Sequence, residues 1–174
     1  GGYAWVADTK NNRIEAWNVA TCTADAGTCK VVPGSPYGTK GSGTGQFSTP
    51  TGIAVDPTTG NVFVADSGNG RVVELSVSGG TVTGVVRTFT GLTDPYGVAA
   101  NGTYVAVAQR ADPGQVVVFN EPSGTAGVTI TGGDVTGGGP TTLYDPENVA
   151  FGPNGDLYIA DTYNDRILGY SLSS

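Results

Sequence analysis

The sequence contains no histidine and no methionine, and only two of its 174 residues are cysteine. Without histidine, the chain cannot build a Ser-His-Asp or Cys-His nucleophile, nor a zinc site with histidine ligands and an activated water. It also lacks any apolar run as long as a membrane-spanning helix requires. We therefore predict no catalytic residue, no metal site, no cofactor and no membrane insertion for this chain.

Basic residues are scarce as well, because eight Lys and Arg stand against fifteen Asp and Glu, a formal net charge of −7. Such a chain repels phosphate backbones, so we expect no nucleic-acid partner. Strong helix formers are few, whereas the 29 glycines and the many Val and Thr residues favour turns and strands. The length suits one domain, and the composition predicts an all-β fold.

The two cysteines, Cys22 and Cys29, lie close together in the polar run CTADAGTC. This spacing favours a small-loop disulfide over free thiols, and no further metal ligands lie nearby. A disulfide in a Thr/Gly/Ser-rich chain with little lysine indicates a protein that is extracellular, periplasmic or at the cell surface. Because the chain has no initiator methionine and no secretory leader, we expect a mature or excised piece.

Internal repeats organise the whole sequence. Four segments share an apolar pattern that ends on Ala followed by Asp or Gln: Trp5–Asp8, Phe63–Asp66, Ala106–Gln109 and Tyr158–Asp161. Three of them continue in a common way, as DTKNNR, DSGNGR and DTYNDR. A second shared element precedes the last three segments: Pro50–Pro57, Pro95–Gly102 and Pro146–Pro153. Each repeat is therefore one structural unit.

Each unit is predicted to contain four short antiparallel strands. In the second unit we place them at Gly52–Val55, Asn61–Asp66, Arg71–Val77 and Thr81–Phe89. Between strands two and three, dipeptides that tolerate positive φ predict tight primed hairpin turns: Asn11-Asn12, Asn69-Gly70 and Asn164-Asp165. Four-stranded units that recur every 40 to 50 residues or so are typical of a β-propeller.

The stretch Gly41–Leu75 resembles an NHL repeat, and the units around Tyr96 and Glu147 resemble further copies. The resemblance implies a propeller of NHL-type blades, which usually closes at about six blades. This chain is predicted to hold about three and a half: a partial blade at 1–46, blades at 47–92 and 93–143, and a partial blade at 144–174. It would be a piece of a larger ring, or would complete the ring with a second chain.

Three acid–base pairs recur at a spacing of five residues. A functional interpretation makes them a ring of charges at the propeller mouth, open to a ligand or cation. A structural interpretation, which we favour, has each Asp capping its turn and pairing with the facing Arg across two strands. In the third unit the Asp and Arg positions change together, to Gln109 and Gln115, as expected if the two side chains depend on each other. The pairs are Asp8–Arg13, Asp66–Arg71 and Asp161–Arg166.

Candidate binding residues are aromatic or basic and lie in loops that the resemblance places on a ligand-facing rim. Such side chains are common anchors of binding surfaces, although ordinary loop packing would explain each tyrosine equally well. Asp145 and Glu147 form the one carboxylate pair near the predicted channel, and Glu15 and Glu74 are expected to be solvated. The rim candidates are Tyr37, Tyr96, Arg110, Tyr144 and Tyr163.

These observations predict a non-catalytic interaction or scaffold module outside the cytoplasm, which binds a protein or glycan partner through its rim loops. One alternative is a fragment of a propeller lyase or hydrolase whose catalytic residues lie in absent blades. Another is a structural subunit that assembles through unpaired edge strands, by self-association or with the remaining blades of a larger chain. The resemblance to the NHL repeat does not distinguish these three functions, because this repeat occurs in enzymes, receptors and scaffolds alike.

Overall fold

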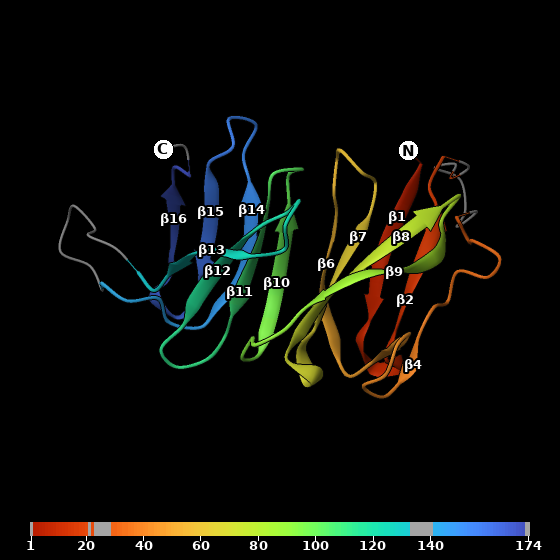
Figure 1. Ribbon diagram of the computed structural model, residues 1–174, viewed down its shortest axis with the longest axis horizontal. Coiled ribbons are helices and arrows are strands. Elements are labelled where there is room, and N and C mark those ends of the chain that lie inside the picture. The colour runs from red at the N-terminus through yellow and green to blue at the C-terminus, as the bar shows by residue number, and fades with distance from the viewer. Residues whose placement is uncertain (1, 21, 23–28, 133–140, 173–174) are drawn as a thin grey trace.

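The computed structural model describes residues 2–20, 22, 29–132 and 141–172, and within them it is built from strands, turns and three short 3-10 helices. Successive antiparallel sheets stand side by side in an arc, with the two chain ends at its opposite ends (Figure 1). The fold is that of a partial β-propeller, as predicted. No helix in the described part of the chain is long and apolar enough to cross a membrane.

The four main sheets share one plan, in which each strand pairs with the next strand in sequence. The first sheet contains β1 (Tyr3–Asp8), β2 (Arg13–Asn18) and β3 (Lys30–Val31). The second contains β6 (Pro50–Val55), β7 (Val62–Asp66), β8 (Arg71–Ser78) and β9 (Thr81–Phe89). The third contains β10 (Pro95–Ala100), β11 (Tyr104–Gln109), β12 (Gln115–Asn120) and β13 (Ala126–Ile130). The fourth contains β14 (Pro146–Phe151), β15 (Leu157–Asp161) and β16 (Arg166–Tyr170).

Two features lie in the connections around the first sheet. A disulfide joins Cys22 to Cys29 between β2 and β3, as predicted. The connection from the first to the second sheet holds a short parallel pair, β4 (Thr39–Lys40) with β5 (Gln46–Phe47), which no repeat pattern indicated. Phe47 is buried there, so this connection contributes to the core.

The turns between strands two and three differ from the prediction. They are not two-residue primed turns; each is a 3-10 turn followed by one left-handed residue. Only the second residue of each predicted dipeptide has positive φ: Asn12 at 55°, Gly70 at 60° and Asp165 at 49°. The preceding Asn stays in the 3-10 helix, where its side chain donates a hydrogen bond to the Asp that ends strand two. The helices are η1 (Thr9–Asn11), η2 (Ser67–Asn69) and η3 (Thr162–Asn164).

The core is a row of apolar layers between neighbouring sheets. Because side chains alternate along a strand, β7 packs on both sides. Val62 and Val64 join Ile14 in a layer shared with the first sheet, whereas Phe63 and Ala65 belong to the layer shared with the third. A further layer joins the third and fourth sheets. Each sheet is therefore held mainly by its immediate neighbours.

The innermost strands approach one another closely, with β10 between β6 and β14. Glycine makes this possible at two equivalent positions. A Cβ on Gly52 would collide with the carbonyl of Tyr96 and lie 2.9 Å from the Val98 nitrogen. A Cβ on Gly97 would lie 2.6 Å from the Glu147 carbonyl oxygen. The strand-one glycines thus set the spacing of the blades at the inner edge.

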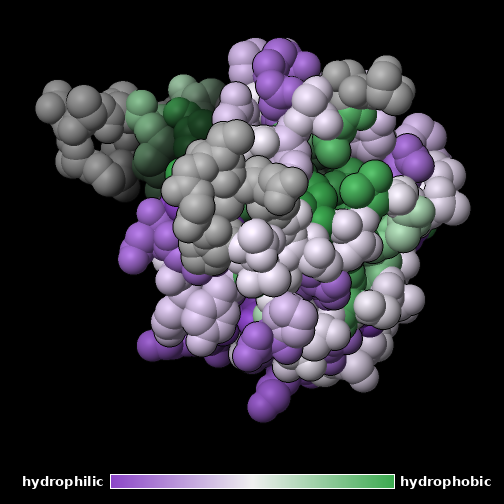
Figure 2. All heavy atoms as spheres, turned by 90° about the vertical axis from the view of Figure 1, so that its left-hand side faces the viewer, coloured by the Kyte–Doolittle hydropathy of each residue, from purple (hydrophilic) through white to green (hydrophobic). Residues whose placement is uncertain are grey.

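The outer faces of the first and last sheets have no neighbouring sheet among the described residues. On the last sheet, Ile167 is 67% exposed and Tyr158 43% exposed beside a shallow apolar pocket of about 170 Å³. Val72 and Val116, which hold the position of Ile167 in the second and third sheets, are buried. Figure 2 views the molecule from the end of the last sheet and shows hydrophobic surface there beside polar turns.

Candidate functional site

Four of the five predicted binding residues lie on one edge of the arc, which we call the turn rim. The turn rim carries the three 3-10 helices and the starts of β6, β10 and β14, along the lower edge in Figure 1. Strand one starts where strand two ends, as the pairing of Pro95 with Gln109 shows. Tyr96 and Arg110 therefore lie together. Tyr144 and Tyr163 lie at the same edge of the next blade, just before β14 and just after β15.

Arg110 is the centre of a charged group that connects the third and fourth blades. Its guanidinium carbon lies 4.1 Å from the centroid of the Tyr96 ring, a cation–π contact. Its Nε lies 3.3 Å from Asp94 Oδ2 and 3.7 Å from Asp145 Oδ1, and Nη1 lies 3.6 Å from Glu147 Oε1. We call these five residues the Arg110 cluster. It holds three carboxylates and one cation, so its net charge is negative.

The electrostatics of the cluster keep Arg110 charged. Burial alone would lower the pKa of Arg110, but the hydrogen bond and charge of Asp94, together with the charge of Asp145, raise it overall. The predicted carboxylate pair, Asp145 and Glu147, is thus engaged by a guanidinium.

A polar pocket of about 250 Å³ opens beside the cluster, at the inner strands. Tyr96 and Glu147 belong to both the cluster and the pocket. Thr51 helps to form the pocket wall, since its hydroxyl donates to the Tyr96 carbonyl at 2.8 Å. The remaining walls come from Thr9 and Asn148, with the two strand-one glycines between them. The pocket is wide enough for a side chain or a single sugar ring.

Tyr144 and Tyr163 form an exposed aromatic pair next to the cluster. Their ring centroids are 5.1 Å apart, and the Tyr163 amide donates to the Tyr144 carbonyl at 3.2 Å. Tyr144 is 48% exposed and Tyr163 is 65% exposed. Neighbouring rings with open faces supply contact area at little entropic cost, which is why tyrosine is common in binding surfaces.

Tyr37 does not join this surface, contrary to our expectation. Its backbone exchanges hydrogen bonds with Ile14, at 3.0 and 2.9 Å. Its ring packs edge-on against buried Phe47, with centroids 6.3 Å apart. The loop that carries Tyr37 folds back onto the layer between the first two sheets, so the half-buried ring packs against the core.

The three predicted Asp–Arg pairs are formed, and the asparagine that lies between the two residues in sequence also donates to the aspartate. In the second blade, Asp66 is buried and its Oδ2 accepts from Asn69 Nδ2 at 2.8 Å and from Arg71 Nε at 2.7 Å. Its Oδ1 accepts from the Ser48 amide at 2.6 Å. Arg71 also donates to the carbonyls of Ser42 and Gln46 at 2.8 Å each, in the incoming connection. The triad therefore anchors the loop that leads into the blade.

The other blades repeat these contacts in part. Asp161 accepts from the Tyr144 amide at 2.7 Å and from Asn164 and Arg166, and the Thr142 carbonyl accepts from Asn164 at 3.0 Å. In the first blade, Asp8 accepts from Asn11 and Arg13. The sequence showed the recurring Asn, but we assigned it to the turn.

The third blade keeps the backbone contact without the charges. The side-chain oxygen of Gln109 accepts from the Thr93 amide, as Asp66 does from Ser48. Its buried Nε2 has no hydrogen-bond partner among the described residues. Gln115 faces Gln109 across the strands. The acceptor for the incoming loop is thus the part of the motif that persists.

Within the described residues, no group of three or more His, Cys, Asp or Glu side chains is placed to hold a metal ion.

Glu15 and Glu74 are not solvated, contrary to our expectation. Glu15 pairs with Arg13 at 2.6 Å, and buried Glu74 pairs with Arg87 at 2.5 Å. Glu74 meets Arg87 across β8 and β9, whereas Glu15 and Arg13 lie two residues apart on one face of β2.

Comparison with known proteins agrees with the repeats. The NHL repeat family matches residues 47–75 and 143–170. The fold is similar to a "putative 6-phosphogluconolactonase" from Bacteroides fragilis, with a TM-score of 0.73, 18% identity, and coverage of 99% of this chain and 48% of that one. A protein with the same description from Bacteroides uniformis gives a TM-score of 0.71, 18% identity, and coverage of 100% and 48%.

A streptogramin B lyase structure is also similar, with a TM-score of 0.57, 14% identity, and coverage of 96% of this chain and 46% of that one. No curated protein shows significant sequence similarity to the chain. At these identities the likeness concerns the fold. The chain spans about half the length of each of these three structures.

Proposed function

We propose that this NHL-repeat β-propeller segment is a non-catalytic binding module that works outside the cytoplasm and engages a protein or glycan through its turn rim. One observation carries the proposal: the exposed Tyr144–Tyr163 pair adjoins the Arg110 cluster, because Tyr144 directly precedes Asp145 in the chain. The cluster in turn shares Tyr96 and Glu147 with the polar pocket. Aromatic faces next to carboxylates suit the sugar rings and hydroxyls of a glycan, or the side chains of a protein. The disulfide supports a site of action in an oxidising compartment.

The test is a binding screen of the purified chain against a glycan array and a library of secreted protein domains. The double variant Tyr144→Ala/Tyr163→Ala is expected to lose at least tenfold in affinity for a ligand found in this way, since aromatic anchors each contribute about 1–2 kcal/mol or more. Its melting temperature should stay near the wild-type value because both rings are largely exposed.

The matched control is Tyr158→Ala, which removes another exposed tyrosine, on the outer face of the last sheet. This variant should bind like the wild type. Equal losses in both variants, or full binding by the rim variant, would contradict the proposal.

An enzymatic function is the second candidate, favoured by the lactonase and lyase names of the similar structures. It would place the catalytic groups in other blades, because the chain has no histidine and the acids of the rim already share Arg110. Purified chain should then hydrolyse no lactone by itself. Lactone hydrolysis by this segment joined to histidine-bearing blades, and not by the 174-residue chain alone, would favour the enzyme over the binding module.

A further inference from the structure

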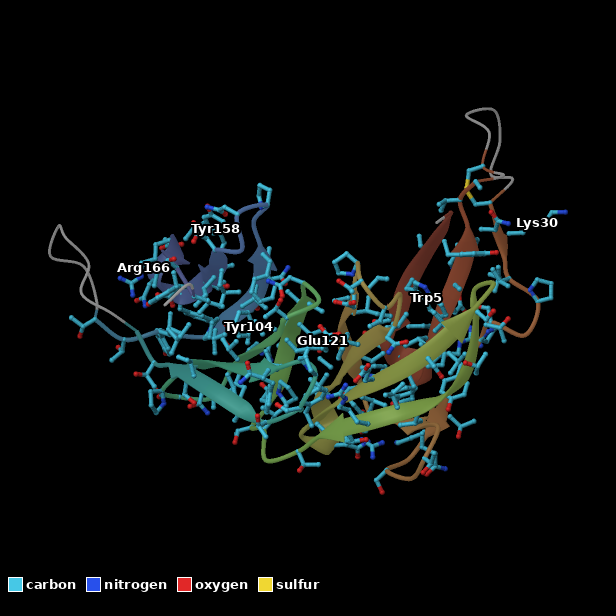
Figure 3. The ribbon with its side chains drawn as sticks, turned by 45° about the horizontal axis from the view of Figure 1, so that its top comes forward. Trp5, Lys30, Tyr104, Glu121, Tyr158 and Arg166 are labelled. Carbon is cyan, nitrogen blue, oxygen red and sulfur yellow. A yellow bond between two sulfur atoms is a disulfide. The ribbon has the colours of Figure 1, made fainter. Side chains whose placement is uncertain are left out.

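Two carboxyl groups meet inside the molecule, between the second and third blades, far along the strands from the turn rim. Asp56 follows β6 and is fully buried, and Glu121 follows β12 and is 4% exposed. Figure 3 places Glu121 near the middle of the arc, where these two sheets meet. Both lie against the turn before β11: a Cβ on Gly102 would be 3.7 Å from Asp56 Oδ2, and the Glu121 amide donates to the carbonyl of the next residue, Thr103. Each carboxyl acts on the pKa of the other.

The remaining contacts of the pair leave one oxygen on each residue without a donor. Asp56 Oδ1 accepts from the amides of Thr58 and Thr59, at 2.8 and 2.6 Å. Asp56 Oδ2 and Glu121 Oε2 are buried and have no hydrogen-bond partner in the described part of the chain. Two charged oxygens could not remain together in such a place. A single proton between them satisfies both.

The neighbouring charges cannot take the place of that proton. Glu74 of β8 and Arg87 of β9 face the same junction, but they pair with each other at 2.5 Å. Glu74 Oε1 accepts from Asn61 Nδ2 at 2.7 Å, and Arg87 donates to the backbone carbonyl of Glu121. Arg87, the cation placed at this junction among the described residues, is thus committed to Glu74 and to a backbone carbonyl, and neither Asp56 Oδ2 nor Glu121 Oε2 has a cation or a donor of its own.

We propose that Asp56 and Glu121 form a proton-operated latch between the second and third blades, closed by one shared proton and opened when that proton is lost. The latch holds the turn after β6 against the turn before β11, because Glu121 is anchored to that turn by its amide, which donates to Thr103 at 2.8 Å. Opening it places two negative charges together in a buried site. The junction between the blades then loosens while the layers on either side remain packed.

The direction of the pH dependence follows from the surroundings. Burial, and then the charge of Asp56, raise the pKa of Glu121 from 4.5 to about 7. For Asp56, burial acts upward, but the hydrogen bonds from Thr59 and Thr58 prevail and lower its pKa below 3.8. Asp56 therefore holds the charge, and Glu121 holds the proton.

Folding takes up one proton where folded Glu121 is protonated and unfolded Glu121 is not. The contribution of Glu121 to the free energy of unfolding is fully present below its ordinary pKa of 4.5 and is lost as the pH rises toward 7. The contribution of Asp56 is lost only in strong acid. The chain should therefore be most stable in mild acid, with its unfolding constant rising by up to about tenfold per pH unit in the intervening range.

Urea unfolding and amide exchange of the purified chain between pH 5 and pH 8 test the latch. Glu121→Gln keeps a donor for Asp56 but cannot titrate, so its stability should be nearly flat where that of the wild type falls. Exchange at Thr103 and Glu121 should accelerate with pH in the wild type beyond the intrinsic rate. Glu147→Gln, on the turn rim, is the matched control and should keep the wild-type slope.

Asp56→Asn provides a second arm if Glu121→Gln folds poorly. Removing the charge of Asp56 should shift the midpoint of the pH profile to lower pH. An infrared band of a buried protonated carboxyl should also be present in the wild type in mild acid and absent from Glu121→Gln. A wild-type profile without a fall above pH 5, or the same fall in Glu121→Gln, would overturn the proposal.

Discussion

At the scale of single residues, Asp66 shows how one buried carboxylate organises a blade. It accepts from a backbone amide, an asparagine and an arginine, so its charge is fully compensated although it is removed from water. The same side chain connects the end of strand two to the loop that leads into strand one. Its loss would leave the Arg71 charge and the Ser48 amide without their shared acceptor.

We expect Asp66→Ala to lower the free energy of unfolding by about 3 kcal/mol, because one partner of a buried pair is removed. Chemical denaturation measures the change. Asp8→Ala is the matched control: it removes the equivalent acid at a partly exposed position, where the side chain is 24% exposed, and its effect should be far smaller. Equal effects at both sites would show that burial does not determine the contribution of the motif.

Thr49 is a second instructive residue. It precedes a strand-one proline and has a φ of 46°, a left-handed conformation that a β-branched residue adopts at a cost. Asp94 and Asp145 hold the same position in the next blades with φ of 45° and 51°, and short polar side chains such as these tolerate it. The conformation is a property of the repeat, and threonine is the residue least suited to it.

Thr49→Asn is therefore expected to stabilise the protein by about 0.5–1 kcal/mol. The side chain is exposed, so no core contact is lost. Thermal unfolding should show a higher melting temperature for this variant and no change for Thr44→Asn, an exposed threonine with negative φ in the preceding loop. A lower melting temperature for Thr49→Asn would mean that the threonine hydroxyl contributes more than the strain removes.

At the scale of elements, the strand-one glycines determine how closely blades approach. Gly52→Ala should destabilise the protein by about 1–3 kcal/mol, since its Cβ would press on the backbone of β10, which cannot give way as a side chain could. Gly84→Ala in β9 is the control, because its nearest neighbour would be Ser76 Oγ at an ordinary 3.4 Å. That change should be neutral or stabilising by urea denaturation. Equal losses in the two variants would contradict this account.

The strands themselves were predictable because each carries its own pattern. Alternating apolar residues and the flanking Pro and Gly located β6 through β9 to within two residues. The turns were harder. The dipeptide Asn69-Gly70 suits a primed turn, but the preceding Ser67 and Gly68 add a 3-10 turn. The parallel pair β4–β5 is two residues on each side, too short to leave a periodic signal.

The site was predictable only where it follows the repeat. The acid–base pairs recur in the sequence, so their partners could be named. Arg110 meets Asp145 and Glu147 because two blades are rotated into contact, and no local pattern shows that. Asp56 and Glu121 are likewise joined only by the folded arrangement. Tyr37 was misplaced because its loop turns back to the core, a path that loop composition does not reveal.

At the scale of the whole molecule, the arc ends on two apolar faces. Tyr158 and Ile167 lie exposed on the last sheet, and Val6 is 43% exposed on the first. In every junction inside the arc, residues at the equivalent positions are covered by the next sheet. These faces are the observation that favours assembly through the ends, with a second chain or with further blades.

We expect the isolated chain to associate with increasing concentration and Ile167→Asp to reduce that association, since a charge cannot be buried at such a face without a partner. Light scattering over a concentration series measures it. Val86→Asp, at an exposed valine on the outer strand β9, should associate like the wild type. A wild-type chain that stays monomeric throughout would exclude assembly through the ends.

The alternation of side chains within each strand has a consequence for how such a chain can evolve. Because each middle sheet carries one apolar face for the blade before it and one for the blade after it, a duplicated unit arrives with both of its contacts ready. A gene for this fold can therefore gain or lose whole repeats by unequal crossing-over without simultaneous changes elsewhere. The third blade, whose Gln109 keeps only the backbone contact of the motif, shows that single copies can then diverge.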